Sequence, residues 1–297
     1  MRKQSAFARA CWRKCRAVVL FVERTEDLGY MKIILPVAGK GERMRPYTNN
    51  LPKCLLPVGG KTIIDWIVEA TRPLTPTETI FITGYKAEVM DRYLTGKPEW
   101  GKTRTVLQSD PQGLGQAISL ALPYVNDDEP LLIILGDTLF DVDIGCLGIY
   151  YIKALRTALK YLMDHDVRTR GEFQLTDALQ MMIEQDCKFR TAPVHEWLDC
   201  GLPETVVQTN TWLLQNKYEL NNINQVVVDQ RNFMHNVKLI PPCIIGESVT
   251  LENCTIGPNV TIGDNCVLKN VNIENCVMWN DGCIEKQTIQ NRIIANR

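Results

Sequence analysis

The stretch that decides the fold reads Lys32-Ile33-Ile34-Leu35-Pro36-Val37-Ala38-Gly39-Lys40-Gly41-Glu42-Arg43. Its first half is a short and almost continuously apolar run, which is typical of a strand buried on both faces of a parallel sheet. Two glycines follow directly, and they let backbone N–H groups approach a phosphate closely. Lys40, Arg43 and Arg45 add positive charge for anionic oxygens. The stretch therefore predicts a buried strand followed by a phosphate-binding loop.

Two better-known glycine-rich phosphate motifs do not fit this region. A dinucleotide-binding turn requires a third glycine at the position of Met44. The later run Val58-Gly59-Gly60-Lys61-Thr62 resembles half of a P-loop, but Leu55 stands where that motif needs its first glycine. An ordinary glycine-rich turn stays open as the alternative reading of residues 38–45.

Short apolar runs and amphipathic stretches alternate beyond this loop. Further strands are predicted at 79–83, 131–135 and 148–152. Helices are predicted at 61–72, 84–95, 114–122, 153–164, 175–186 and 203–215. This alternation predicts an α/β fold with a mostly parallel, Rossmann-like sheet. Because such sheets bind ligands beyond the carboxyl ends of their strands, we expect the site in the loops after residues 37 and 135.

The pattern changes at about residue 240, where apolar pairs two residues apart recur every five or six residues. The pairs are Cys243-x-Ile245, Val249-x-Leu251, Cys254-x-Ile256, Val260-x-Ile262, Cys266-x-Leu268, Val271-x-Ile273 and Cys276-x-Met278. Such pairs predict a β-helix of hexapeptide repeats over 237–285, making about two three-sided coils, with a tail at 286–297. Its inner positions must be small and apolar, so we expect Cys254, Cys266 and Cys276 to serve there as small hydrophobic residues.

Composition excludes several classes of protein. The 297 residues carry 33 Lys+Arg and 34 Asp+Glu, a formal net charge of −1, which argues against nucleic-acid and membrane-surface binding. No apolar run approaches the roughly 20 residues that span a bilayer. The 11 cysteines include no C-x-x-C pair, so free thiols in a reducing cytoplasm are expected rather than a zinc ribbon or a disulfide scaffold. His165, His195 and His235 are scattered and not predicted to be catalytic.

Residues 1–30 differ from the rest of the chain. Six basic residues precede the first acidic residue, Glu23. The apolar patch at 17–22 is shorter than the core of a signal peptide and is followed at once by charged residues. We expect residues 1–30 to be a disordered extension, or Met31 to be the true start.

Several motifs in order resemble those of the sugar-phosphate nucleotidyltransferases, which include glucose-1-phosphate thymidylyltransferases and mannose-1-phosphate guanylyltransferases. The first is Gly39-x-Gly41-x-Arg43 with Pro52-Lys53-x-Leu55-Leu56-Pro57-Val58. The others are Gln108 with Gly113-Leu114-Gly115-Gln116-Ala117, Leu135-Gly136-Asp137, Gly171-Glu172-Phe173-Gln174-Leu175-Thr176-Asp177, and Trp197-Leu198-Asp199-Cys200-Gly201. The repeats resemble the left-handed β-helix that many members carry. The likeness covers about 31–284, with a nucleotidyltransferase domain expected at 31–236.

The resemblance implies a reaction and a set of roles. A sugar 1-phosphate attacks the α-phosphate of a nucleoside triphosphate, giving an NDP-sugar and pyrophosphate. Asp137 and Asp199 would hold Mg²⁺, which favours carboxylate and phosphate oxygens. Arg43 would bind the β- and γ-phosphates, and Lys53 would neutralise charge near the α-phosphate. The backbone at Ala38, Gly39 and Gly41 would contact the nucleotide, and Gln108 and Gly113 would contact its base.

Other readings of three acidic residues remain open. Asp137 could be an ordinary turn residue at a strand end. Asp199 could be the N-cap of the helix expected near residue 203. Glu172 is an acceptor-side candidate, or a plain acid at a helix start.

The sequence departs from the family between Asp137 and the Gly148-Ile149-Tyr150 strand. Relatives carry several dozen more residues there, with a Glu-Lys-Pro motif whose lysine binds the sugar phosphate, and no Glu-Lys-Pro occurs in this chain. The nucleotide half of the site thus looks whole and the acceptor half shortened. We expect NTP–Mg²⁺ binding to survive better than turnover.

The leading hypothesis is a nucleotidyltransferase that uses Mg²⁺, an NTP (dTTP or UTP favoured by the resemblance) and a hexose 1-phosphate. The second is a regulatory homologue that binds nucleotides and acts through oligomer contacts. A hexapeptide-repeat acyltransferase is disfavoured, because two coils are few and the repeats hold no histidine. An open β-helix end needs a cap or a partner, which favours a homo-oligomer.

Overall fold

The computed structural model describes residues 19–21, 31–141, 152–192, 194–217 and 226–295. The chain divides into two compact units. Unit 1 comprises Met1–Lys40, Asn50–Lys53 and Ile67–Trp197; unit 2 comprises Gly41–Asn49, Cys54–Trp66 and Leu198–Arg297. This division differs from the expected boundary at residue 237, because two early segments and a late helix pack with the C-terminal strands.

Unit 1 is built on a four-stranded parallel sheet in the order β6-β5-β2-β7. Its strands are β2 (Lys32–Pro36), β5 (Glu78–Thr83), β6 (Thr103–Leu107) and β7 (Leu131–Ile133). The predicted α/β class with a parallel sheet is confirmed. The sequence pattern did not reveal β6, because this strand lies at the end of the sheet, has three polar residues among its five, and is partly exposed throughout.

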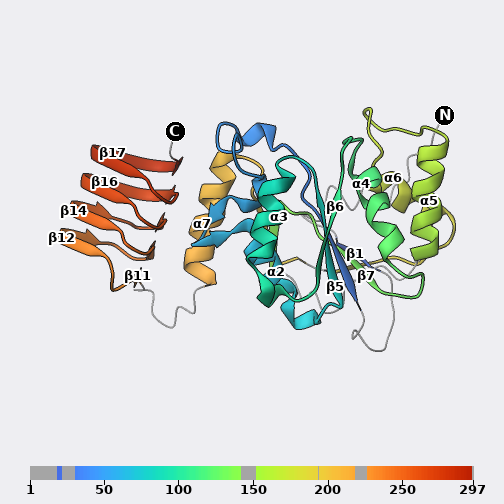
Figure 1. Cartoon of the computed structure of the whole chain (residues 1–297), viewed down its shortest axis with the longest axis horizontal. Coiled ribbons are helices and arrows are strands. Elements are labelled where there is room, and N and C mark those ends of the chain that lie inside the picture. Colours follow the sequence, from blue (N-terminus) through green and yellow to red (C-terminus); the bar gives the residue numbers. More distant parts are fainter. Residues whose placement is uncertain (1–18, 22–30, 142–151, 193, 218–225, 296–297) are drawn as a thin grey trace. The chain divides into compact units, whose positions relative to one another are not determined.

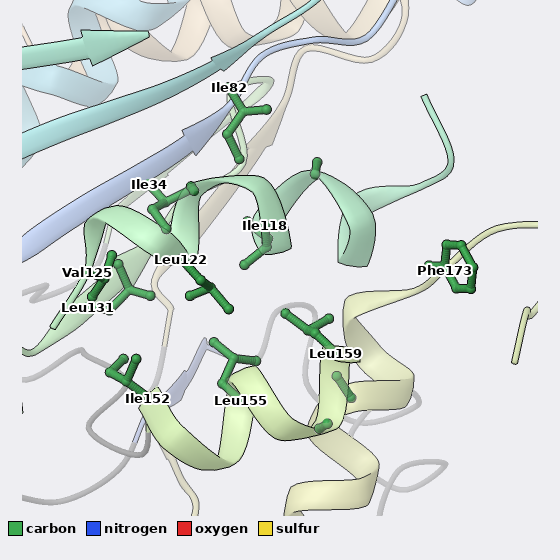
Figure 2. Close-up of a cluster of buried hydrophobic side chains, with 14 of the residues drawn as sticks. Ile34, Ile82, Ile118, Leu122, Val125, Leu131, Ile152, Leu155, Leu159 and Phe173 are labelled. Carbon is green, nitrogen blue, oxygen red and sulfur yellow. The ribbon is translucent and has the colours of Figure 1, made fainter. Parts of the chain in front are cut away.

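The predicted helices of unit 1 form within a few residues of their expected bounds. They are α3 (Ala87–Thr95), α4 (Leu114–Ala121), α5 (Ile152–Asp164) and α6 (Leu175–Glu184), and α2 (Ile63–Thr71) runs from unit 2 into unit 1. Helix α4 contacts β2 and β5, and α5 and α6 pack on α4 (Figure 1). Figure 2 shows the resulting core, in which Ile118 of α4 and Leu122, the residue directly after it, face Leu155 and Leu159 of α5.

Charged residues hold the amino ends of the same strands together. Glu78, the first residue of β5, is 2% exposed and forms ion pairs with Lys32 of β2 (3.4 Å), Lys102 (3.4 Å) and Arg104 of β6 (2.9 Å). Burial alone would raise the pKa of Glu78, but the charges and hydrogen bonds of Arg104 and Lys102 outweigh it and hold that pKa below its usual value.

The remaining short elements complete unit 1. They are η3 (Arg72–Leu74), η4 (Pro98–Trp100), η5 (Leu122–Tyr124), β8 (Thr138–Asp141) and the antiparallel pair β1 (Val19–Phe21) and β9 (Arg190–Ala192), while η2 (Lys53–Leu55) and β10 (Glu196–Asp199) each run from unit 1 into unit 2. The pairing of β1 with β9 differs from the expectation that all of 1–30 is disordered. The strand expected at 148–152 falls outside the described residues except for Ile152, which begins α5.

Unit 2 is dominated by one seven-stranded parallel sheet that coils along the sequence. Its strands are β11 (Val226–Val228), β12 (Phe233–Leu239), β13 (Cys243–Ile245), β14 (Thr250–Ile256), β15 (Val260–Ile262), β16 (Val267–Met278) and β17 (Cys283–Ile294). The register stacks Val226, Cys243, Val260, Cys276 and Arg292 on one another, so the chain returns to the same column every 16 or 17 residues. We call this sheet the coiled sheet (Figure 1).

The coiled sheet is longer than the predicted two coils over 237–285, because four returns separate those five stacked residues. Its first coil begins before the repeats become regular, and its last strand, β17, includes most of the stretch expected as a tail. The sequence pattern missed β12 and cut β17 short because their residues are largely polar or exposed. On β17, Gln287 stands where the preceding coil has the buried Val271, so the apolar spacing is broken there.

The inner positions of the coiled sheet hold small apolar side chains, as predicted. Cys254, Cys266 and Cys276 are at most 3% exposed and lie among buried Val, Ile and Leu. Burial raises the pKa of the Cys266 thiol to about 11 and raises that of Cys276. The Cys266 and Cys276 thiols therefore stay protonated near neutral pH, and the three buried cysteines serve as small hydrophobic groups.

Asparagines with positive φ form the corners of the coiled sheet and stack between coils. The Asn236 side chain donates to Asn253 Oδ1 (2.8 Å), and the Asn253 side chain donates to Asn270 Oδ1 (3.4 Å). On another corner, Asn259 donates to Asn275 Oδ1 (2.9 Å). Asparagine suits these corners because its short polar side chain tolerates the left-handed region and bonds locally.

Helix α7 (Pro203–Asn216) attaches to the coiled sheet through a buried asparagine. Asn210 Oδ1 accepts from Thr261 Oγ1 (2.7 Å) on β15 and from the Gly59 N–H (2.9 Å), which lies between β3 (Pro57–Val58) and β4 (Lys61–Thr62). Its Nδ2 donates to the Asn259 carbonyl (3.3 Å). One fully buried side chain thus ties α7, the β3–β4 turn and the coiled sheet together.

Across the described parts of the chain, no helix is both long enough and apolar enough to span a membrane.

Candidate active site

In unit 1, the structure brings a lysine predicted to neutralise phosphate charge and an aspartate predicted to bind the metal into direct contact. Asp137 follows β7 at the carboxyl edge of the sheet, and its Oδ2 forms an ion pair with Lys53 Nζ of η2 at 2.7 Å. The Lys53 side chain is 12% exposed and the Asp137 side chain 39%. Asp137 Oδ1 accepts from Thr138 Oγ1 (3.2 Å). Asp137 thus presents a partly exposed carboxylate whose charge Lys53 balances.

The donors around Asp137 fit a magnesium ion only if phosphates complete its coordination. Among the described residues, no group of three or more His, Cys, Asp or Glu side chains could hold a metal. Mg²⁺ is commonly bound by one or two carboxylates together with substrate phosphates and water, rather than by an all-protein cage. A half-exposed carboxylate beside a lysine suits that mode of binding.

Gln108 and Gly113, the predicted base contacts, also lie together in unit 1. Gln108 follows β6, is 7% exposed, and donates from Nε2 to Gln116 Oε1 (2.6 Å) and to the Gly113 carbonyl (3.4 Å). Gly113 has φ 110°, and a Cβ there would lie 2.7 Å from the Phe173 carbonyl oxygen. Only glycine fits this position. Sequence reasoning quoted Gln116 within the motif but did not assign it a role.

Ala38 and Gly39 lie where β2 ends, next to the end of β5. The Tyr85 N–H donates to the Ala38 carbonyl (3.0 Å), and a Cβ on Gly84 would lie 2.8 Å from the Ala38 Cβ. Gly39 is exposed. This close approach fixes the start of the loop that follows β2, as expected for a parallel sheet.

Glu172 lies beside the loop that carries Gln108 and Gly113 rather than in a helix. A Cβ on Gly113 would come within 2.8 Å of the Glu172 Cβ, and Gln174 Nε2 donates to Glu172 Oε2 (3.0 Å). Helix α6 begins at Leu175 with Gln174 as its N-cap, so Glu172 precedes the helix and remains exposed.

In unit 2, the short helix η1 (Glu42–Met44) carries Arg43. Gly41 is the N-cap of η1, and the Gly41 carbonyl accepts from Thr48 Oγ1 (2.9 Å). Met44 and Thr48 are fully buried, whereas Arg43 is exposed. The buried residues anchor the segment on both sides of an arginine that is left accessible.

Arg43 and Asp199 converge on the space above Gly201. A Cβ on Gly201 would lie 2.8 Å from Asp199 Oδ2 and 3.3 Å from an Arg43 Nη. The alternative that Asp199 caps α7 is wrong, because the N-cap is Leu202, whose backbone N–H donates to Thr205 Oγ1 (3.1 Å). The structure thus groups two predicted phosphate and metal residues around a glycine whose role the sequence reasoning did not identify.

The coiled sheet supports the Arg43 segment within unit 2. Tyr47 donates its hydroxyl to the Ile293 carbonyl of β17 (3.2 Å) and meets the Trp279 ring edge-on, with centroids 5.7 Å apart. The last coil is therefore in contact with the segment that carries Arg43.

Comparison with known proteins identifies the first half of the chain. Residues 31–147 match the family model described as Nucleotidyl transferase. This stretch is similar to the nucleotidyl transferase family. The resemblance to the sugar-phosphate nucleotidyltransferases, inferred above from ordered motifs, is confirmed, and the strand–loop stretch at 32–43 lies at the start of the matched region.

Two curated relatives extend the likeness beyond this domain. The "Bifunctional protein GlmU" of Methanocaldococcus jannaschii is 28% identical over 231 residues, covering 62% of this chain and 54% of that protein. The "Low-salt glycan biosynthesis nucleotidyltransferase Agl11" of Haloferax volcanii is 26% identical over 243 residues, covering 63% of this chain and 67% of that protein. The chain thus spans between about half and two thirds of their lengths.

A solved UDP-glucose pyrophosphorylase in complex with UDP-glucose is also similar, with 16% identity and a TM-score of 0.46, over 61% of this chain and 97% of that one. In the alignment with the Methanocaldococcus relative, 231 positions take in only 62% of these 297 residues. The relative therefore has positions with no counterpart in this chain.

Proposed function

We propose that this protein transfers a nucleotidyl group from a nucleoside triphosphate to a sugar 1-phosphate and releases pyrophosphate. The observation that carries the proposal is the Lys53–Asp137 ion pair at the carboxyl edge of the sheet, within the segment that matches the nucleotidyl transferase family. A lysine and a carboxylate in contact supply what in-line phosphoryl chemistry needs, which is charge neutralisation and alignment.

The acceptor needs no general base from the protein. The second pKa of a phosphate monoester is about 6, so the attacking oxygen is already anionic at neutral pH. Lys53 would balance the charge of the α-phosphate, and Arg43 would bind the β- and γ-phosphates and stabilise the departing pyrophosphate. Backbone groups at Ala38, Gly39 and Gly41 would orient the triphosphate.

Asp137 and Asp199 would hold Mg²⁺ together with the phosphates. The ion would supply charge neutralisation and a template for the phosphate oxygens. Gln108 and Gly113 would receive the base, and Glu172 would stand on the acceptor side. The base and the sugar remain part of the proposal, with dTTP or UTP and a hexose 1-phosphate as the first substrates to test.

We further propose that the coiled sheet is a left-handed β-helix of the kind that many members of the family carry. Its recurrence every 16 or 17 residues and its asparagine corners support this assignment. Among the described strands β17 pairs with β16 alone, at the end of the ladder, which supports homo-oligomer formation through this region.

Asp137→Asn tests the proposed chemistry. The change removes the charge that balances Lys53, so we expect pyrophosphate release to fall about 100- to 1000-fold with little loss of stability. Asp127→Asn is the matched control, because Asp127 is also in unit 1, equally exposed and paired with basic residues. Equal activity of the two variants would rule out a catalytic role for Asp137.

A regulatory nucleotide-binding role is the second candidate, favoured by the absence of a Glu-Lys-Pro motif from the sequence. Calorimetry with NTPs and Mg²⁺, run beside the pyrophosphate assay, separates the two. Binding without turnover across a panel of hexose 1-phosphates supports regulation, and turnover supports the transferase.

A further inference from the structure

The base loop of unit 1, residues 108–116, depends on a second segment for its shape. The Phe173 N–H donates to the Gln112 carbonyl (2.9 Å), and the Gly115 N–H donates to the Phe173 carbonyl (2.7 Å). A Cβ on Gly113 or on Gly115 would lie within 3.0 Å of the Phe173 carbonyl oxygen. The loop that carries Gln108 therefore packs closely against the stretch that carries Glu172 and is hydrogen-bonded to it.

One arginine joins these two segments. Arg168 Nη2 donates to Gln112 Oε1 (2.9 Å) in the base loop, and its Nη1 donates to the Gly171 carbonyl (3.3 Å). Its guanidinium lies 4.0 Å from the Phe173 ring centroid, which is cation–π contact distance. Arg168 Nε also donates to Asp166 Oδ1 (2.6 Å), which further restricts the orientation of the Arg168 side chain.

These contacts use the whole planar fork of the guanidinium. A lysine at position 168 could donate to one of the two segments but could not stack on Phe173 and bond to Gln112 and Gly171 in one geometry. The arrangement is thus specific to arginine, although the Arg168 side chain remains 32% exposed.

Arg168 contacts residues just before the N-terminus of α4, and a second arginine makes similar contacts just after the C-terminus of α4. Arg156 of α5 donates to the Leu122 carbonyl (3.2 Å) and the Val125 carbonyl (3.0 Å), beyond the C-terminus of α4, and pairs with Asp127 (3.3 Å). Its side chain is 39% exposed. Arg156 therefore resembles Arg168 in charge, exposure and number of partners, but lies at the end of α4 away from Gly113.

We infer that Arg168 is a positioning residue for base recognition, acting through Gln112 and Phe173 to hold the Glu172 segment against the base loop. This inference rests on the proposed function, since it assigns a purpose to the geometry around Gln108. It goes beyond it by naming the residue that couples the base side of the site to the acceptor side.

The test compares Arg168→Ala with Arg156→Ala. We expect Arg168→Ala to weaken NTP affinity about tenfold, to raise KM for the NTP more than it lowers kcat, and to reduce discrimination between pyrimidine and purine NTPs. Arg168→Lys should recover only part of the affinity. Arg156→Ala should lower the melting temperature without changing NTP affinity or base preference.

A double-mutant cycle tests the route of the effect. If Arg168 acts through Gln112, the losses in NTP affinity of Arg168→Ala and Gln112→Ala will be strongly non-additive. Additive losses, or an Arg168→Ala variant whose NTP affinity and base preference match the wild type, would overturn the inference.

Amide hydrogen exchange separates this inference from the proposed function, because it needs no ligand. Exchange at Gly115 and Phe173 should speed up in Arg168→Ala and not in Arg156→Ala. A wild-type protein that binds no NTP would refute the proposed function, and unchanged exchange at these two amides would refute the clamp itself.

Discussion

The two parallel sheets of this protein are held together by opposite means. In unit 1, the strands come from distant parts of the sequence, and helices such as α4 cover the sheet. At the starts of the strands, the Glu78 carboxylate forms ion pairs with three basic side chains. In unit 2, each strand pairs with the strand about 17 residues away, and asparagines stack at the corners. One sheet relies on tertiary contacts and the other on repetition of a local pattern.

The difference explains where chemistry can be placed. The strands in unit 1 end in loops with unrelated sequences. Different residue types, such as Asp137, Gln108 and Ala38, can therefore stand at the same edge of the sheet. The corners of the coiled sheet repeat the same asparagine geometry, which leaves less freedom for a site. The coiled sheet instead contributes support, through Tyr47, to the segment that carries Arg43.

Leu268→Ala should have the largest effect on stability, about 3 kcal/mol, because Leu268 is fully buried between stacked coils. Repeat structures transmit a defect mainly to their neighbours. Amide exchange should therefore rise around Leu251 and Ile284, which stack on it, and remain slow in β5. The matched change Leu155→Ala should loosen the core of unit 1 instead. A Leu268→Ala variant that speeds exchange in β5 would contradict the contrast.

Gly201→Ala should reduce turnover about 100-fold with little change in melting temperature. The new Cβ would displace the Asp199 carboxylate and the Arg43 guanidinium, and a displacement of about 1 Å can cost this much. Gly96→Ala is the control, since its Cβ would meet only ordinary contacts at 3.4 Å or more. Turnover is measured as steady-state pyrophosphate release. Full activity in Gly201→Ala would show that Gly201 does not position the Asp199 and Arg43 side chains for catalysis.

Glu78→Gln should cost about 2 kcal/mol at pH 7, since it breaks three ion pairs to a buried carboxylate. The pKa of Glu78 is lowered by folding, so its contribution is present above the unfolded-state pKa and is lost as the pH falls through the folded-state pKa. Urea melts between pH 7 and pH 3 should show the variant and the wild type converging in acid. A difference that is constant with pH would show that charge is not what holds these strand starts.

Asn253→Ala should cost about 1 kcal/mol, the smallest effect, by removing one stacked side chain and straining a corner with φ 53°. Asn253→Gly removes the same hydrogen bonds but accepts the backbone geometry. Comparing the two by chemical denaturation divides the cost between the ladder and the corner. Equal losses would assign it to the ladder alone.

The sequence pattern predicted elements well where burial was uniform and poorly where it was not. The strands at 32–37 and 79–83 are predominantly apolar and are predicted, whereas β6, at the end of its sheet, is largely polar and is not. The inner coils were found from their Cys–Val–Ile spacing. The outer strands β12 and β17 were missed or cut short, because they carry more exposed residues.

By itself, the sequence determined the fold class, because strand burial leaves a local pattern. Its ordered motifs, through their resemblance to the sugar-phosphate nucleotidyltransferases, gave Arg43, Lys53, Asp137 and Asp199 as candidates. Only the tertiary structure decided which side chains meet. The Lys53–Asp137 pair, the convergence of Arg43 and Asp199 over Gly201, and the Arg168 clamp on Gln112 join residues far apart in the chain. No local pattern encodes such a meeting, since it depends on how the strands order and how the loops pack.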